Sequence, residues 1–122
     1  MEKIAISSEG PSLDALVDPR FGRAAGFLIV DPNTMAFEYL ENGAAQAMGQ
    51  GAGIQAAETV AQTGAKIVLT GYVGPKAFQA LSATGIKIGQ NLENITVREA
   101  VERYKASDIE IADQPNKQVH WS

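Results

Sequence analysis

Short hydrophobic runs alternate with polar, glycine-rich segments along the chain, and the first three runs have the spacing of β-strands. In segment 3–7 two isoleucines alternate with other residues, which predicts a first strand. Segments 26–31 and 36–41 predict two more. Pro32-Asn33 between them favours a turn, because proline presets φ and asparagine tolerates a turn position. These two strands are therefore predicted to form an antiparallel hairpin.

The middle of the chain alternates between helical periodicity and short apolar runs. From Ile54 onward, apolar residues recur with a helical period until Gly64, which is placed to end that helix. The continuous apolar run 66–70 suits a strand that is buried on both faces. Pro75 lies where a second helix would begin, and Gly85 lies where it would end.

A fifth strand and a third helix complete the predicted elements. The run 86–88 predicts the strand. Thr96 and Glu99 have the spacing of a capping box, in which Thr96 caps the N–H of Glu99 while the Glu99 side chain reaches back. The helix is predicted to run to residue 104 or 105. Its inner side is expected to carry Val97, Val101 and Tyr104.

The order of these elements predicts the fold class. A hairpin followed by two strand–helix units indicates an α/β domain with helices packed on a mixed sheet. This single domain is predicted to span 1–106. The glycine- and alanine-rich stretch 42–53 is interpreted as a loop, and 107–122 as a polar C-terminal tail.

Composition narrows the class of protein. With 122 residues, of which 45% are hydrophobic and 20% charged, the chain is typical of one folded domain. It has no cysteine, which excludes disulfides, thiolate zinc sites and cysteine-held iron–sulfur clusters. The net charge of −4 disfavours broad nucleic-acid binding. With no signal peptide or membrane-spanning segment in the pattern, we expect a cytoplasmic monomer that does not bind membranes.

Two glycine-rich loops precede the first two predicted helices. Ligands of open α/β sheets bind beyond the carboxyl ends of the parallel strands, where both loops are expected. Glycines let the backbone approach a ligand, and helix N-termini offer N–H groups to anions. We therefore predict an anion pocket at this edge. Its candidate residues are Met48, Gly49, Gly51 and Gly53 in the first loop, and Gly71, Tyr72, Val73, Gly74 and Lys76 in the second.

A simpler interpretation of each loop stays open, since glycines before helices are more often plain turns. The G-x-G-x-G spacing of 49–53 matches neither the dinucleotide fingerprint nor the Walker P-loop, so a nucleotide is poorly supported. For Met48, a thioether ligand to Cu(I) is conceivable, but packing within the loop is the favoured interpretation.

A third candidate element lies just before the hairpin. Two arginines flank a Phe-Gly turn and have the planar N–H donors that clamp an anion. The alternative is that both arginines are solvated or pair with Asp14 and Asp18. The candidate residues of this element are Arg20, Phe21, Gly22 and Arg23.

Catalytic constellations are scarce in the sequence. His120 is the only histidine, and it lies in the predicted tail beside Trp121, where a flexible terminal residue is favoured over a base or ligand. The aspartates Asp14, Asp18 and Asp31 show no spacing specific to a metal site. We therefore predict no catalytic residue and no metal ligated directly by side chains.

Three segments resemble the dinitrogenase iron–molybdenum cofactor biosynthesis proteins, a family of small cofactor carriers and related domains. Segment 20–31, with its Arg-Phe-Gly-Arg start, is similar to the family's phenylalanine–glycine–arginine motif and hairpin. Segment 51–57 resembles its glycine-rich helix start, and 71–88 is the most specific of the three. The resemblance covers residues 1–104.

The resemblance implies a ribonuclease H-like α/β fold, with a five-stranded mixed sheet flanked by helices, and binding of a metal–sulfur cluster. One family member holds a mixed molybdenum–copper sulfide cluster without covalent ligation, and this chain is similar to it in having no cysteine. Arg20 stands where the family frequently has histidine, so iron ligation is not expected. A thiometallate brings its own sulfide ligands and negative charge, which N–H donors, cations and a soft apolar wall would hold.

Three functions are compatible with these features. The leading hypothesis is a carrier that binds a preassembled Mo–Cu–S cluster and exchanges it with partner proteins. The alternative is a regulatory or adaptor domain that uses the same surface for a protein partner or a small oxyanion. An enzyme acting on a phosphorylated small molecule is disfavoured, because the sequence shows neither the base nor the metal site that it would need. A ribonuclease H-type nuclease is also disfavoured, because the predicted first strand lacks the aspartate that would help to hold Mg²⁺.

Overall fold

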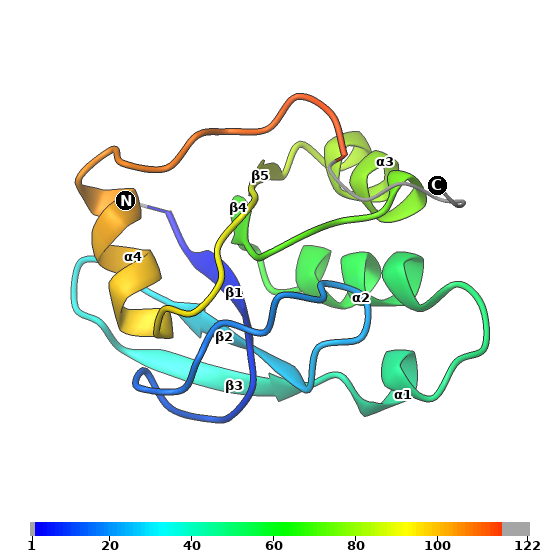
Figure 1. The fold of residues 1–122 in the computed structure, drawn as a ribbon, viewed down its shortest axis with the longest axis horizontal. Helices are drawn as coiled ribbons and strands as arrows, with labels where there is room; N and C mark the ends of the chain where they lie inside the picture. The colour runs from blue at the N-terminus through cyan, green and yellow to red at the C-terminus, as the bar shows by residue number, and fades with distance from the viewer. Residues whose placement is uncertain (1, 116–122) are drawn as a thin grey trace.

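The computed structural model describes residues 2–115 and contains a five-stranded mixed sheet with helices on both faces (Figure 1). The strand order is β3-β2-β1-β4-β5, in which β1 pairs antiparallel with β2 and parallel with β4. No helix within residues 2–115 is long and apolar enough to cross a membrane. The strands are β1 (Ile4–Ser8), β2 (Gly26–Val30), β3 (Phe37–Glu41), β4 (Ile67–Leu69) and β5 (Lys87–Gly89); the helices are α1 (Gly43–Gln46), α2 (Ala52–Ala61), α3 (Pro75–Ala83) and α4 (Val97–Lys105).

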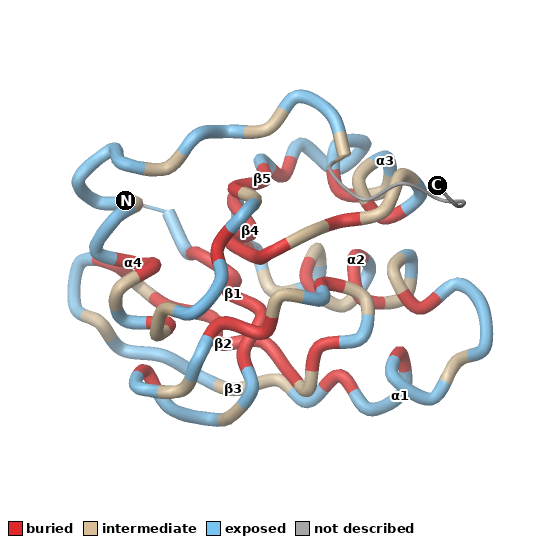
Figure 2. The backbone as a smooth tube through the Cα atoms, in the orientation of Figure 1, coloured by how far each residue is buried: buried red, intermediate tan, exposed pale blue. Residues whose placement is uncertain are grey.

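Alternate residues of the central strands face opposite sides of the sheet and pack into two separate cores. In β1, Ala5 faces the core formed with α2 and α3, while Ile4 and Ile6 face the core formed with α4. The same alternation in β2 sends Phe27 and Ile29 to the first core. Figure 2 shows the result, with buried residues concentrated in the middle of the sheet.

The predicted fold class is confirmed, including the mixed sheet and the hairpin of β2 and β3. Gly64 and Gly85 follow their helices with positive φ, as expected of residues that end helices. The interpretation of 42–53 as a loop is wrong in part, because α1 lies within it and α2 begins at Ala52. The buried Asn42 donates its side-chain amide to the carbonyls of Gly22 and Ala24 just before α1 begins.

The capping box forms only on one side. The hydroxyl of Thr96 accepts a hydrogen bond from the N–H of Glu99, at 3.1 Å. The Glu99 carboxylate instead accepts from Arg103 one turn later, at 2.8 Å. This pair competes with the predicted return contact. Val97 and Val101 are buried as predicted, and Tyr104 packs half-buried against the same core.

Part of the predicted polar tail 107–122 packs against the domain within the described residues. Ile109 packs against the α4 core, and Ile111 forms an antiparallel bridge with Gly89 of β5. The N–H of Ala112 donates to the carbonyl of Ile88. Two isoleucines are too short a pattern to predict a strand, so the sequence missed this pairing. His120 lies outside the described residues.

Candidate functional site

A cavity lies at the edge of the sheet where α2 and α3 begin. The strands that lead to these helices, β3 and β4, both run parallel to β1, so both helices start at the same edge. The cavity has a volume of about 650 Å³, which is within the range of ligand pockets. Its lining residues are Arg20, Phe21, Gly22, Arg23, Gly49, Gln50, Gly51, Ala52, Gly53, Ile54, Tyr72, Gly74, Pro75, Lys76 and Ala77.

The segment before β2 is fixed to the loop after β4 by backbone pairing. The N–H of Tyr72 donates to the Pro19 carbonyl at 2.8 Å, and the N–H of Phe21 donates to the Tyr72 carbonyl at 3.3 Å. A Cβ on Gly71 would lie 2.5 Å from the Cα of Pro19, so only glycine permits this approach. The pairing aligns Arg20 beside Tyr72 at the cavity.

Small residues bring the two helix N-termini together. A Cβ placed on Gly53 would lie only 2.9 Å from the Cβ of Ala77 in α3. A Cβ on Gly22 would lie 3.0 Å from the backbone of Gly53. Gly51, the residue before α2, has φ of 78°, a conformation that favours glycine. Larger residues at these positions would separate the walls of the cavity.

Five backbone N–H groups at these helix starts have no hydrogen-bond partner within the described chain. The first intrahelical bonds run from Gln55 to Gly51 and from Phe78 to Gly74, so the N–H groups before them have none to make. Pro75 contributes no N–H. Together with the helix dipoles, these groups form a positive backbone surface. They belong to Ala52, Gly53 and Ile54 of α2, and to Lys76 and Ala77 of α3.

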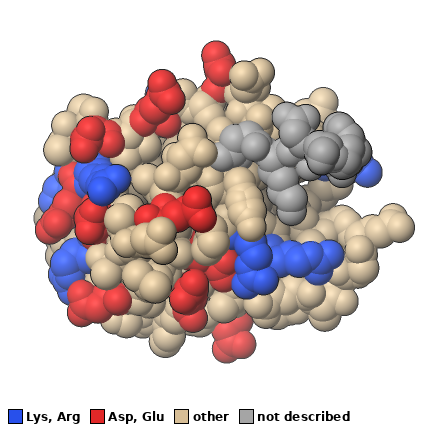
Figure 3. Space-filling view, in the orientation of Figure 1, with Lys and Arg blue, Asp and Glu red and all other residues tan. Residues whose placement is uncertain are grey.

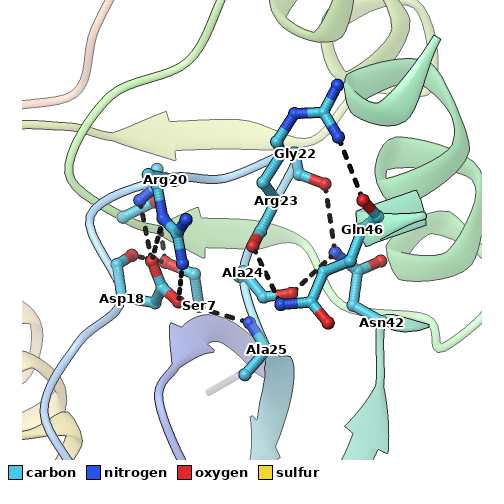
Figure 4. Close-up of polar contacts among 10 residues, drawn as sticks. Ser7, Asp18, Arg20, Gly22, Arg23, Ala24, Ala25, Asn42 and Gln46 are labelled. Carbon is cyan, nitrogen blue, oxygen red and sulfur yellow. Dashed lines mark hydrogen bonds and ion pairs between the residues drawn. The ribbon is translucent and has the colours of Figure 1, made fainter. Parts of the chain in front are cut away.

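Arg20 is held at the cavity by the buried carboxylate of Asp18, which is 2% exposed (Figure 4). Arg20 Nε and Nη2 each lie 3.3 Å from an Asp18 oxygen, and the N–H of Ala25 donates to the same carboxylate. The hydrogen bond to Asp18 and, to a smaller extent, the negative charge of Asp18 raise the pKa of the Arg20 guanidinium above its ordinary value. The Arg20 side chain is 52% exposed, so it is accessible to a ligand.

Arg23 anchors the segment that leads into α2. Its Nη1 donates to the carbonyls of Gln46 and Met48, at 3.0 and 2.8 Å. The Gln46 side-chain amide donates back to the Arg23 carbonyl, as Figure 4 also shows. Arg23 nevertheless lines the cavity and is exposed to solvent. Arg23 therefore supplies charge while it fixes the loop.

The charge at the cavity is opposite to that of the whole chain. Its charged lining residues are Arg20, Arg23 and Lys76, without an Asp or Glu among the lining residues described, although the chain carries a net −4. In the space-filling view basic side chains form a patch, with uncharged surface on one side of it and acidic side chains on the other (Figure 3). The chain thus concentrates cations where two helix N-termini also meet, which suits an anion.

Comparison with known proteins identifies the family. Residues 2–107 match the family model described as dinitrogenase iron-molybdenum cofactor. The chain belongs to this family. A search of curated proteins returned no match.

Two solved structures are similar to this chain over nearly its whole length. The apo form of the orange protein from Desulfovibrio gigas is 61% identical, with a TM-score of 0.94, covering 96% of this chain and 98% of that one. A putative NifB protein from Thermotoga, assigned to the DUF35 family, is 32% identical, with a TM-score of 0.77, covering 91% of this chain and 93% of that one.

Most residues predicted for the site in this family member lie together at the cavity, and three do not. Val73 is 1% exposed and packs in the core of α2 and α3. Gly71 lies under Pro19, and Met48 packs half-buried against the same core. These three do not line the cavity. For Val73 the reason is that the loop after β4 is short and its aliphatic side chain packs in the core.

The structure also adds five lining residues that sequence reasoning missed, namely Gln50, Ala52, Ile54, Pro75 and Ala77. Three of them, Ile54, Pro75 and Ala77, lie in the first turn of a predicted helix, and none of the three was predicted to line the pocket. Ala77 carries the only local signal, since a small residue two positions after Pro75 permits close approach of another backbone.

The donor set of the cavity suits an anion that needs no ligating side chain. Within residues 2–115, no cluster of three or more His, Cys, Asp or Glu side chains is arranged to hold a metal ion. The groups that face the cavity are N–H donors, two guanidinium groups and a lysine, beside the aromatic residues Phe21 and Tyr72. Such donors bind the outer atoms of a preformed anion rather than a bare cation.

Proposed function

We propose that this protein is a carrier for a preassembled, anionic metal–sulfur cluster, of molybdenum–copper sulfide type, bound non-covalently in the cavity between α2 and α3. The observation that carries the proposal is the convergence of five unpartnered N–H groups with Arg20, Arg23 and Lys76. The cluster is cargo, and it supplies its own sulfide ligands.

The chemistry of the cavity favours sulfide over oxide as the outer atoms of the cargo. Sulfide is larger and more polarizable than oxide and loses less hydration free energy when it leaves water. The cavity pairs its cations with apolar and aromatic surface from Ile54, Tyr72 and Pro75. A small, strongly hydrated oxyanion would gain little from these walls.

Family membership supports a cofactor-carrying role, and the 61% identity with the orange protein supports a carrier resembling that protein. We extend the proposal to a monomeric cytoplasmic protein without catalytic activity. Its partners would be proteins that donate or receive the cluster, and neither nucleic acid nor membrane would bind it. A regulatory domain for a protein or a small oxyanion is the competing function.

Reconstitution tests the proposal. The metal-free protein is incubated with tetrathiomolybdate and Cu(I), desalted, and examined by visible spectroscopy and metal analysis. We expect a coloured protein that retains molybdenum and copper at a fixed ratio. With molybdate in place of tetrathiomolybdate, retention should fall by about tenfold or more, which corresponds to about 1.4 kcal/mol of binding free energy. A colourless, metal-free protein would refute the carrier role and favour the regulatory domain.

A further inference from the structure

Asp18 carries a buried carboxylate next to the cavity lining, although no step of cargo binding requires a negative charge there. Its side chain is 2% exposed, and Asp18 is not among the residues that line the cavity. Burial of an ionised carboxylate costs free energy unless hydrogen bonds and a countercharge offset it. Both are present at Asp18, and together they act on one residue of the cavity.

Polar contacts with the sheet fix the backbone of Asp18. Its N–H donates to the Ser7 carbonyl near the end of β1, at 2.9 Å, and its own carbonyl accepts from the Ser7 hydroxyl at 2.6 Å. The Ser7 hydroxyl oxygen also lies 2.7 Å from that of Thr70, the residue after β4. All three residues are buried, so two neighbouring strands hold Asp18 in place.

The carboxylate of Asp18 in turn fixes the orientation of Arg20. One oxygen accepts from the Arg20 backbone N–H at 3.1 Å and from Nε at 3.3 Å, and the other accepts from Nη2 at 3.3 Å (Figure 4). These contacts occupy the Nε side of the guanidinium. Within residues 2–115 the Nη1 group makes no hydrogen bond, so its N–H donors remain for a ligand of the cavity.

The three cations of the cavity differ in how far their charge is offset. Arg20 lies against a buried carboxylate, whereas Arg23 donates to carbonyl groups and Lys76 forms no ion pair within the described residues. Because Asp18 is shielded from water, its charge is screened less than that of an exposed carboxylate. Asp18 therefore lowers the positive field that Arg20 contributes to the cavity.

The strength of this field affects which anions the cavity prefers. A compact, strongly hydrated anion binds only where attraction by the site exceeds its large cost of leaving water, whereas a larger anion loses less hydration and needs a weaker field. Molybdate and tetrathiomolybdate have the same charge and the same tetrahedral shape, and they differ in the size and hydration of their outer atoms. A weaker field at Arg20 therefore disfavours molybdate more than tetrathiomolybdate.

We propose that Asp18 is a specificity-determining residue of the cavity, which positions Arg20 and offsets its charge so that large, sulfide-coated anions are preferred to compact oxyanions. Asp18 acts through Arg20 and does not itself touch the cargo. This role rests on the proposed function, because it concerns the cargo of the same cavity.

Equilibrium dialysis of the metal-free protein against molybdate or tetrathiomolybdate, without copper, tests this role. Asp18→Asn keeps the size of the side chain and removes its charge, so the ratio of the two dissociation constants should shift towards molybdate by about threefold or more. Arg20→Gln keeps an N–H donor for Asp18 and removes the cation, so the ratio should shift in the opposite direction. A purely structural role of Asp18 would instead weaken the binding of both anions by the same factor.

The double variant with Asp18→Asn and Arg20→Gln measures the charge of Asp18 a second time. Its pair of side chains is neutral, like the ion pair that it replaces, so the ratio should return towards that of the unmodified protein. This comparison with Arg20→Gln remains decisive if the single variant Asp18→Asn does not fold. Asp14→Asn is the matched control, because Asp14 also pairs with an arginine, Arg98, at an exposed position that does not line the cavity.

Two results would overturn the role of Asp18 alone. They are a ratio that Asp18→Asn leaves unchanged in both backgrounds, and an equal shift in the Asp14→Asn control. In either case, binding of tetrathiomolybdate by the unmodified protein would leave the carrier proposal intact. Failure of the unmodified protein to bind either anion would refute the carrier proposal and the role of Asp18 together.

Discussion

Gly53→Val is expected to abolish cluster retention while the sheet remains folded. Even the first atom of the new side chain, its Cβ, would lie 2.9 Å from the Cβ of Ala77, and the two methyl groups beyond it need more room. The N-termini of α2 and α3 must therefore move apart, which separates the N–H groups that converge on the cargo. Overpacking of this kind costs about 1–3 kcal/mol of stability. Retained molybdenum per protein, measured after desalting, is the test.

The matched control for this substitution is Gly43→Val. Gly43 begins α1, its added Cβ would meet no atom within 4 Å, and it does not line the cavity. We expect this variant to retain the cluster like the unmodified protein. Circular dichroism of both variants checks that each is folded. Full retention by folded Gly53→Val would show that the close approach of the two helices is not needed for binding.

Replacing Arg20 and Arg23 together by alanine is expected to weaken cluster retention by at least about tenfold, since each charge-assisted hydrogen bond that is lost contributes about 1.5–3 kcal/mol. The change removes both guanidinium groups from the cavity lining. It also leaves the buried Asp18 carboxylate without its ion pair, so the melting temperature should fall. Metal retention is therefore compared at a temperature where the variant is fully folded by circular dichroism.

Arg98→Ala with Arg103→Ala is the control of equal charge. Both arginines lie on α4 and pair with Asp14 and Glu99, remote from the cavity lining, and their loss changes the net charge by the same two units. We expect retention close to that of the unmodified protein. Equal losses in the two double variants would assign the effect to the overall charge of the chain. Unchanged retention without Arg20 and Arg23 would remove these arginines from the site.

The elements that sequence predicted well are those specified locally. The Pro32-Asn33 turn lies between the two strands of the observed hairpin, and Gly64 follows the helix that it was predicted to end. The alternation of Ile4 and Ile6 also gives the face of β1 that meets α4. In each case the signal lies within a few residues of the feature that it specifies.

What sequence missed depends on contacts between distant segments. The buried Asn42, before α1, bonds to carbonyls of Gly22 and Ala24, about twenty residues earlier. The pairing of Ile111 with Gly89 likewise becomes visible only once the sheet is assembled. Neither contact leaves a periodic pattern in the sequence.

The two arginines show why the sequence alternatives could not be separated. From sequence, Arg20 could either pair with Asp18 or bind an anion. In the structure Arg20 forms the ion pair with Asp18, and its side chain is still 52% exposed at the cavity. For Arg23, the carbonyl partners Gln46 and Met48 depend on the fold of the α1 segment. A role in structure and a role in binding are thus compatible for both residues.

The most direct test of the cluster site follows the backbone amides of the protein by ¹⁵N–¹H NMR as the cluster is added. The account predicts that the largest shifts occur at Ala52, Gly53, Ile54, Lys76 and Ala77, whose N–H groups face the cavity without a partner in the described chain. Amides of α4, on the opposite face of the sheet, should be nearly unchanged. Shifts concentrated at α4, or at the edge strand β3, with the helix starts unaffected, would contradict the account.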